Sequence, residues 1–220
     1  MSMNDVWRDI SKYINVYTSE NFDDVPSKPG VYAWYYPIKG PSKDISDLSL
    51  ELASILDYDS AIQDSVSGSA DVKFNWKTTK VKISEESNVK LKPSSKKTWG
   101  ELIPDEELYV DFRKVLLASS ILMPPLYIGK TNNLLRRCIE HRKGSGSSED
   151  KNEFHTRFEE YTKTKILENG KNFYTNEVED LIFVCIRASA SSLDDNKENG
   201  IEELLENILQ VIAKPPYSRK

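Results

Sequence analysis

The sequence predicts a mixed α+β protein, an α/β chain in the broad sense, and three observations lead to this class. Residues 31–38 are dense in aromatic and β-branched side chains, which are enriched in strands. Residues 124–141 change from a short apolar run to apolar positions at helical spacing, as in a strand that leads through a turn into a helix. Residues 200–213 repeat apolar side chains every three to four positions, which predicts an amphipathic helix.

The composition is that of a globular protein. The chain has 220 residues and a mass of 25.2 kDa, which suits one domain, or one domain with a large insertion. No apolar run is long enough to cross a bilayer, and the first residues lack a signal-peptide pattern, so we expect a cytoplasmic protein with no membrane partner. Cys138 and Cys185 lie in apolar segments and are expected to be buried thiols.

Two elements are expected before the insertion. Residues 3–15 place four apolar side chains at helical spacing, which predicts a short helix. Residues 31–38 predict a strand, whose side chains point alternately to the two faces of a sheet. Tyr32, Trp34 and Tyr36 then share one face. Trp34 and Tyr36 either extend a site around Tyr32 or pack beside it, and the sequence leaves both readings open.

Residues 39–124 are expected to form an inserted helix–hairpin–helix subdomain. Residues 44–64 and 104–120 have helical periodicity, and residues 70–84 alternate as a hairpin does. Residues 84–98 are rich in serine and lysine and are expected to be mobile. On the second helix, the side chains expected to face inward are Leu108, Phe112, Val115 and Leu116.

Positive charge is concentrated in this insertion, although the whole chain has a net charge of -5. Eight lysines but only two acidic residues occur between Lys73 and Lys97. One reading is a DNA-contacting arm, because lysines release counterions from phosphates and an aromatic side chain can stack or wedge. The other is an edge hairpin that its lysines protect from aggregation, and the sequence supports both readings equally. The contact residues of such an arm are expected to be Lys73, Trp76, Lys77, Lys80 and Lys82.

The segment from residue 124 to residue 141 brings three reactive side chains together. Tyr127 lies on the expected strand, and Arg137 and His141 lie four positions apart on the expected helix, so they share a face. This set suits a phosphodiester, because arginine grips phosphate oxygens and tyrosine or histidine can move a proton. On this segment alone, an ordinary strand–turn–helix with a surface arginine is the simpler reading. The basic side chains expected to contact DNA in this segment and directly after it are Arg136, Arg142 and Lys143.

Three further elements are expected in the last third of the chain. Residues 152–169 predict a charged helix, residues 178–187 a strand and residues 200–213 a final helix. The apolar side chains of the final helix expected to face inward are Ile201, Leu204, Leu205, Ile208 and Ile212.

Three motifs resemble those of the GIY-YIG nuclease superfamily. The first is Gly-Val-Tyr at residues 30–32. The second is Leu-Tyr-Ile-Gly-Lys-Thr-Asn-Asn-Leu at residues 126–134, followed by Arg137, ten positions after the tyrosine, and by His141. The third is Leu-Glu-Asn-Ile-Leu at residues 205–209, followed by a Pro-Pro-Tyr run. Each motif alone is a weak signal, whereas all three in the family's order are specific.

The resemblance implies a small antiparallel β-sheet of about three strands, flanked by helices. Tyr32 and Tyr127 are then expected on adjacent strands. In the family these strands usually form one short hairpin, whereas here a long insertion separates them, which is tolerable because closure entropy grows slowly with loop length. The expected division is a catalytic domain of residues 1–38 and 125–220, with 39–124 inserted. Ser218 stands where the family usually has asparagine, which leaves the packing of that segment open.

The resemblance also implies a metal-dependent DNA endonuclease that hydrolyses phosphodiester bonds. Glu206 would hold one Mg²⁺ (or Mn²⁺), an ion that commonly takes only one or two carboxylates. Arg137 would offset the charge that builds on the phosphate. Tyr32 is favoured as general base and Tyr127 as the residue that orients water, although both tyrosines are candidates for the base. His141 would relay the proton, and Lys130 would assist electrostatically.

Three functional readings remain open at this point. The first is a sequence-recognising nuclease of restriction or mobile-element (homing) type, a class that often acts as a homodimer. The second is a structure-specific nuclease of repair or recombination. The third is a non-catalytic nucleic-acid-binding module that keeps the fold. The last is disfavoured because an inert scaffold has no need of Tyr32, Tyr127, Arg137 and Glu206 together.

Overall fold

The computed structural model describes residues 10–40, 43–49, 51–52, 69–74, 77–82, 92–143, 154–159, 177–187, 195–213 and 215. The chain divides into two compact units, one of residues 1–39 with 115–220 and one of residues 40–114. The insertion expected at 39–124 therefore contains the second unit, while residues 115–124 belong with the first. Among the described residues, no helix is both long and apolar enough to cross a membrane.

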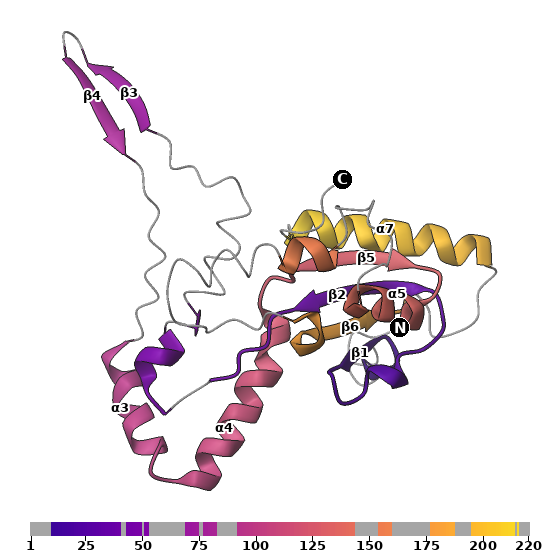
Figure 1. Ribbon diagram of the computed structural model, residues 1–220, viewed down its shortest axis with the longest axis horizontal. Helices are drawn as coiled ribbons and strands as arrows, with labels where there is room; N and C mark the ends of the chain where they lie inside the picture. The colour runs from indigo at the N-terminus through magenta and orange to yellow at the C-terminus, as the bar shows by residue number, and fades with distance from the viewer. Residues whose placement is uncertain are drawn as a thin grey trace, which may run out of the picture. The chain divides into compact units, whose positions relative to one another are not determined.

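The first unit is built on a four-stranded antiparallel sheet flanked by helices (Figure 1). The strand order is β1-β6-β2-β5, with β1 at Ile14–Tyr17, β6 at Ile182–Ile186, β2 at Gly30–Tyr35 and β5 at Tyr127–Thr131. β2 pairs with β5 on one side and with β6 on the other, so the first tyrosine strand is central and the second is at an edge. The mixed class and the small antiparallel sheet are as predicted.

The fourth strand corrects the prediction for the N-terminal region. A helix was expected over residues 3–15, but the described part is a 3-10 turn at Ile10–Lys12 followed by β1, which pairs with β6. The sequence Ile14-Asn15-Val16-Tyr17 is too short for its strand alternation to be distinguished from the helical spacing of the residues before it. Tertiary pairing with β6 decides the conformation.

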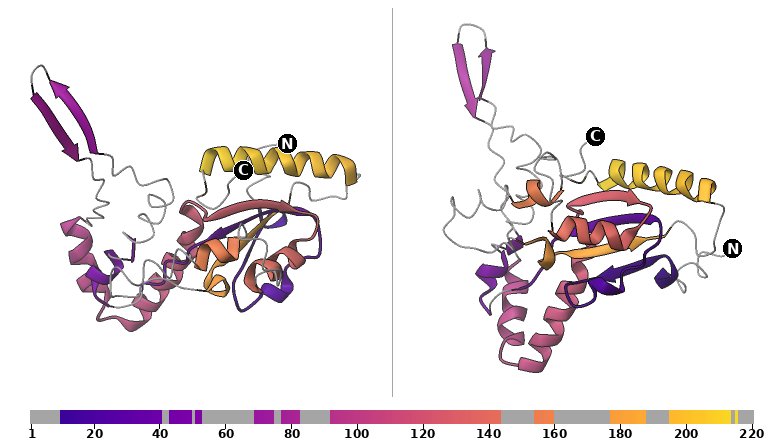
Figure 2. Two further views of the ribbon diagram at one scale, coloured as in Figure 1. Left: turned by 45° about the horizontal axis from the view of Figure 1, so that its top comes forward. Right: turned by 45° about the vertical axis from the view of Figure 1, so that its right-hand side comes forward.

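Helices cover the two faces of this sheet separately. On one face, Val31, Ala33 and Ile128 form a buried cluster, against which Leu205 and Leu209 of α7 (Asp195–Ala213) pack. On the other face lies α5 (Leu134–Lys143), whose Leu134 would be 2.9 Å from a Cβ placed at Gly30. The strand alternation predicted for residues 31–35 is therefore confirmed. Figure 2 shows α7 lying along the sheet from two further directions.

An aromatic core fills the α5 face. Trp34 is completely buried, and its ring lies 4.6 Å from that of Phe183 on β6 and 5.9 Å from those of Phe22 and Phe154. Phe154 and Phe158 lie on a helical segment described at residues 154–159, inside the expected helix 152–169. β6 begins at Ile182, later than expected, because a 3-10 turn at Val178–Asp180 precedes it.

The side chains that α7 exposes to solvent include most of those that were predicted to face inward. Glu202 is buried and Leu205 and Leu209 contact the sheet cluster, so the helix turns a partly charged face inward. The helix also begins earlier than expected, at Asp195. Two apolar stripes run along it, and spacing alone does not tell which of them meets the sheet. Of the side chains expected to face inward, those that are exposed are Ile201, Leu204, Ile208 and Ile212.

The second unit contains a hairpin and helices. The hairpin predicted near residues 70–84 is present as β3 (Ser69–Phe74) paired with β4 (Lys77–Lys82). Residues 45–49 and 51–52 are helical, as expected, and the buried Glu51 carboxylate accepts a hydrogen bond from Gly40 N at 2.9 Å. α3 (Pro93–Leu102) lies partly in the segment expected to be mobile, so that expectation is wrong for residues 93–98.

Trp99 explains why α3 is ordered and how α4 (Glu106–Ala118) is oriented. Its indole N–H donates to Lys43 O at 2.9 Å, and its ring meets Tyr109 edge-on at 6.0 Å. Tyr109 is buried, whereas Leu108 and Val115, both expected to face inward, are exposed. The apolar spacing was correct, but the aromatic contact with Trp99 selects a neighbouring face.

Candidate active site

Gly129 makes the close approach of two tyrosines possible. In the β2–β5 register, Gly129 is opposite Tyr32 and Tyr127 is opposite Trp34. A Cβ at Gly129 would lie 2.7 Å from Tyr32 Oη and 2.8 Å from Tyr127 Cε1, which is closer than real Cβ contacts. The two tyrosine rings stack with centroids 5.8 Å apart. Only glycine at this position lets the Tyr32 ring lie across β5.

Arg137 reaches this pair from the first turns of α5. Asn133 Oδ1 accepts a hydrogen bond from Arg136 N at 2.9 Å, so Asn133 caps the N-terminus of the helix. Arg137 Nε donates to Tyr32 Oη at 3.2 Å and Nη1 donates to Glu140 Oε2 at 3.0 Å. Burial alone would lower the pKa of Arg137, but Tyr32 and Glu140 raise it, so the guanidinium is charged. Its side chain is 35% exposed and is reachable from solvent.

His141 and Arg137 both reach Tyr32 Oη, as their four-residue spacing predicted, but His141 lies in the core. It is buried at 4% exposure, with Nδ1 3.0 Å from Trp34 Nε1 and Nε2 3.3 Å from Tyr32 Oη. Burial, together with Arg137, lowers its pKa well below the usual value, so the imidazole is neutral at neutral pH. The helix brings it there because positions 134, 138 and 141 share the buried face.

The two tyrosines differ in their environment. Tyr32 is 1% exposed, and burial followed by the neighbouring Tyr127 raises its pKa well above the usual value. Arg137 opposes this increase but does not cancel it. Tyr127 is half-buried and lies on the edge strand. Of the two phenols, Tyr127 is therefore the one that a substrate can reach.

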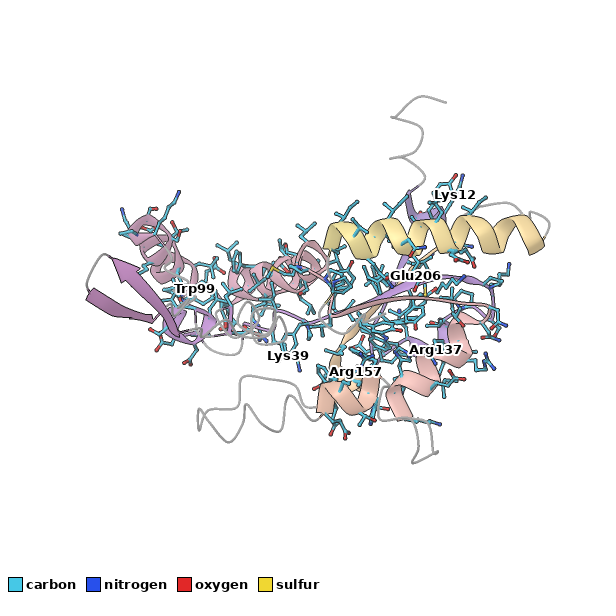
Figure 3. The ribbon with its side chains drawn as sticks, turned by 90° about the horizontal axis from the view of Figure 1, so that it is seen from above. Lys12, Lys39, Trp99, Arg137, Arg157 and Glu206 are labelled. Atoms are coloured by element: carbon cyan, nitrogen blue, oxygen red, sulfur yellow. The ribbon has the colours of Figure 1, made fainter. Side chains whose placement is uncertain are left out.

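Lys130 and Glu206 lie on the other face of the same edge strand. Lys130 donates to Glu203 Oε2 at 2.9 Å, and this hydrogen bond raises the pKa of Lys130. Glu206 Oε1 accepts from Gln210 Nε2 at 3.1 Å, and Gln210 also donates to Ile128 O. Figure 3 shows Glu206 on the α7 side of the strands and Arg137 on the α5 side. The structure places Tyr32, Tyr127, Arg137 and His141 together on the α5 side of the sheet. Glu206, which was expected to join the tyrosines and Arg137, lies on the α7 side.

This arrangement does not fit the magnesium site expected at Glu206. The carboxylate is on the α7 side, whereas the phenols and the guanidinium are on the α5 side of the sheet. Within the described ranges, no group of three or more His, Cys, Asp or Glu side chains is arranged to hold a metal ion. An Mg²⁺ ion needs only one or two carboxylates, but here that carboxylate is not aimed at the reactive cluster.

The expected DNA-contacting residues fall into two groups. On α5, Arg136 is 63% exposed and Lys143 is exposed, while Arg142 is mostly buried, paired with Glu179 at 3.0 Å and placed over the Phe22 ring. Arg142 therefore has a structural role between α5 and the turns around it. In the hairpin, the backbone register pairs the β4 lysines with β3, and Trp76 lies outside the described residues.

Sequence reasoning missed two features of the candidate site and left a third undecided. The packing role of Gly129 required the β2–β5 register, and the pairing of Glu140 with Arg137 is visible only as a three-residue spacing. Trp34, read either as cleft or as packing, packs in the core and also contacts His141. The sequence signal for this contact was a tryptophan on the same strand face as Tyr32, because an indole N–H can donate a hydrogen bond but cannot accept one.

Comparisons with known proteins add no family. No family model matches the chain, and searches of curated proteins and of solved structures find no match either.

Proposed function

We propose that this protein is a nucleic-acid phosphodiesterase, and specifically a DNA endonuclease, with its active site at Tyr127 and Arg137. The observation that carries the proposal is the cluster of Arg137, Tyr32, Tyr127 and His141 on one face of the sheet, beside its edge strand. A charged, partly exposed guanidinium next to an accessible phenol suits a phosphodiester. The resemblance of three sequence motifs to the GIY-YIG superfamily supports the same class.

Arg137 supplies the electrostatic part of the chemistry. Its Nε is held by Tyr32 and its Nη1 by Glu140, so the guanidinium plane is fixed before a substrate binds. A preorganised cation of this kind stabilises the charge that builds on non-bridging phosphate oxygens as water attacks phosphorus and the P–O bond breaks. Tyr32 therefore acts by positioning Arg137.

Tyr127 is the better of the two tyrosines to receive a proton from water. Tyr32 is buried and its pKa is raised well above the usual value, which disfavours the phenolate. His141 is buried and neutral and touches Tyr32, so it supports the cluster from the core side. The role of general base, which the resemblance favoured for Tyr32, is thus assigned to Tyr127, and Tyr32 positions Arg137.

Metal dependence is a separate part of the proposal, tested by itself. Because Glu206 is on the α7 side of the sheet, no step of the mechanism is assigned to a metal bound there. Cleavage assays with Mg²⁺, Mn²⁺ or EDTA measure the dependence directly. Glu206→Ala then tests the site: loss of cleavage with retained DNA binding assigns the metal to Glu206, and full cleavage excludes it.

The matched pair Arg137→Ala and Arg136→Ala tests the proposed site. Both remove one arginine from the same turn of α5, but Arg136 is 63% exposed and contacts Asn132 and Glu140 rather than a tyrosine. On plasmid DNA we expect Arg137→Ala to lower the cleavage rate by about 100-fold or more. Arg136→Ala is expected to change it far less. Equal losses for the two variants would exclude a special role for Arg137.

The choice of substrate distinguishes the remaining readings. Discrete plasmid fragments indicate a sequence-recognising enzyme, for which the lysine-rich hairpin offers a contact surface and a homodimer a way to cut both strands. Cleavage restricted to flaps or junctions indicates a structure-specific nuclease. Binding of DNA without cleavage under any metal condition indicates a non-catalytic binding module, and RNA is included as a substrate in the same assay.

A further inference from the structure

We propose that Trp34 sets the direction of the hydrogen bonds that reach Tyr32, the residue that holds Arg137, and is thereby a positioning residue. Trp34 lies on the central strand β2 and is completely buried. A role of Trp34 in catalysis rests on the proposed function. The hydrogen-bond direction itself is a property of the folded chain and can be measured without a substrate.

The direction begins at a group that can only donate. Trp34 Nε1 donates to His141 Nδ1 at 3.0 Å, and an indole N–H has no acceptor capacity. This hydrogen bond therefore requires that Nδ1 carries no hydrogen. Because burial keeps His141 neutral, its single ring hydrogen must be on Nε2.

The next two steps follow from this tautomer. His141 Nε2 lies 3.3 Å from Tyr32 Oη, so its hydrogen is donated to the phenol oxygen. Arg137 Nε donates to the same oxygen at 3.2 Å. With two donors on its lone pairs, the Tyr32 hydroxyl turns its own hydrogen away from His141 and Arg137.

The result is a one-way chain from the core to Tyr32. Trp34 donates to His141 and His141 donates to Tyr32, so the Tyr32 oxygen accepts from both His141 and Arg137. With the hydrogen on Nδ1 instead, Nε2 would accept the Tyr32 hydrogen. Trp34 excludes this reversed arrangement.

The test is the tautomer of His141 in the full-length protein with ¹⁵N-labelled histidine. Long-range ¹H–¹⁵N correlation spectra separate a protonated ring nitrogen from a bare one. We expect a single Nε2–H tautomer in the wild type. Trp34→Phe, which keeps an aromatic ring but removes the donor, should give a substantial Nδ1–H population. Tyr32→Phe should leave Nε2–H in place, because a tyrosine hydroxyl can donate or accept and so does not set the tautomer.

Phe22→Leu is the packing control, because the Phe22 ring meets the Trp34 ring edge-on and, among the described residues, makes no ring contact with His141. This variant should keep the wild-type tautomer. If Trp34→Phe does not fold, 3-benzothienylalanine at position 34 replaces the N–H by sulfur at nearly the same volume. The inference is overturned by an Nδ1–H tautomer in the wild type, or by a tautomer that changes in Tyr32→Phe but not when the indole N–H is removed.

Kinetics separate this inference from the proposed function. If the tautomer follows Trp34 but the protein cleaves no nucleic acid, the hydrogen-bond chain stands and the nuclease proposal fails. If the protein cleaves DNA, Trp34→Phe should lower kcat by about 10- to 100-fold with KM little changed, and Phe22→Leu should not. An unchanged kcat in a variant whose tautomer has changed would remove the catalytic role of Trp34.

Discussion

At the scale of single residues, the site depends on one glycine and one buried histidine. Gly129 lets the Tyr32 ring lie across the edge strand, and His141 joins the aromatic core to the buried Tyr32 hydroxyl. Neither residue needs to touch a substrate. Both act by fixing where the Tyr32 hydroxyl lies, and Tyr32 in turn holds Arg137.

Gly129→Ala should destabilise the protein and displace Tyr32. The added Cβ would lie 2.7 Å from Tyr32 Oη and 2.8 Å from the Tyr127 ring, and overpacking of this kind costs about 1–3 kcal/mol. Urea unfolding measures the loss, and near-UV circular dichroism measures the change around the tyrosines. Gly200→Ala is the control, because its Cβ would meet nothing within 4 Å and alanine stabilises a helix interior by about 0.5–1 kcal/mol. Equal effects at the two positions would contradict this account.

His141 should make stability depend on pH between about 5 and 6.5. Burial lowers its folded pKa below the unfolded value of about 6.5, so the unfolded chain binds a proton in this range that the folded protein does not. The stability that His141 contributes is thus complete above pH 6.5 and is lost as the pH falls, by at most about 1.4 kcal/mol per pH unit. The advantage of wild type over His141→Gln in urea unfolding should shrink accordingly. A difference that stays constant from pH 7.5 to 5 would contradict the burial of a neutral imidazole.

At the scale of elements, α7 illustrates why a helix can be predicted while its orientation is not. It carries apolar side chains on two stripes, and the stripe that contains Leu205 and Leu209 packs against the sheet. Inward polar groups are tolerated there because they are bonded, as Gln210 is to Ile128 O. The other stripe is exposed, with Leu204 at 61% and Ile212 at 74%.

Truncations on the two stripes should therefore have different costs. Leu209→Ala removes a contact with the sheet cluster and should lower the free energy of unfolding by about 2 kcal/mol. Leu204→Ala, on the exposed stripe, should change it by less than about 0.5 kcal/mol. Thermal and urea unfolding of the two variants measure the difference. A larger loss for Leu204→Ala would mean that the helix faces the sheet with its other side.

At the scale of the whole molecule, the chain interrupts one compact unit to insert another. Hydrogen bonds within the first unit join the chain segments that precede and follow the insertion. Leu126 N donates to Trp34 O at 2.7 Å, and Ile38 N donates to Ser120 Oγ at 2.8 Å. The site residues on β2, β5 and α5 all belong to this unit. The lysine-rich hairpin belongs to the second unit.

Replacing residues 40–114 by a flexible Gly/Ser linker should leave a first unit that unfolds cooperatively. Its sheet and aromatic core lie entirely outside the deleted residues, and a long loop can be exchanged for a shorter one at modest entropic cost. Urea unfolding followed by tyrosine and tryptophan fluorescence tests this. A truncated chain without a cooperative transition would show that the two units fold as one.

The same truncation tests the proposed DNA-contacting arm. Its loss should weaken DNA binding and reduce the salt dependence of the affinity, because fewer phosphates are neutralised. Full-length protein with Lys73, Lys77, Lys80 and Lys82 changed to glutamine should reproduce the effect. Unchanged affinity in both proteins would leave the hairpin as a protected edge with no role in binding.

Much of the framework could be predicted because it depends on local chemistry. Alternation over residues 31–35 placed Tyr32 and Trp34 on one face, and the helical spacing of apolar residues after the turn predicted α5. The strand β1 and the inward faces of α4 and α7 could not be predicted. A short segment, or a helix with apolar side chains on two faces, is compatible with more than one packing. Those choices are made by distant partners, such as β6 for β1 and Trp99 for Tyr109.

The sequence by itself determined the mixed class, the strand–turn–helix that carries Tyr127 and Arg137, and the lysine-rich hairpin. These features depend on periodicity, capping and charge, which are properties of residues close together in the sequence. Only the tertiary structure decided that Tyr32 and His141 are buried, that Tyr127 is the accessible phenol, and that Glu206 lies across the sheet from them. The physical reason is that burial and hydrogen-bond partners arise from contacts between segments far apart in the chain, and these contacts set the pKa and the direction of each proton.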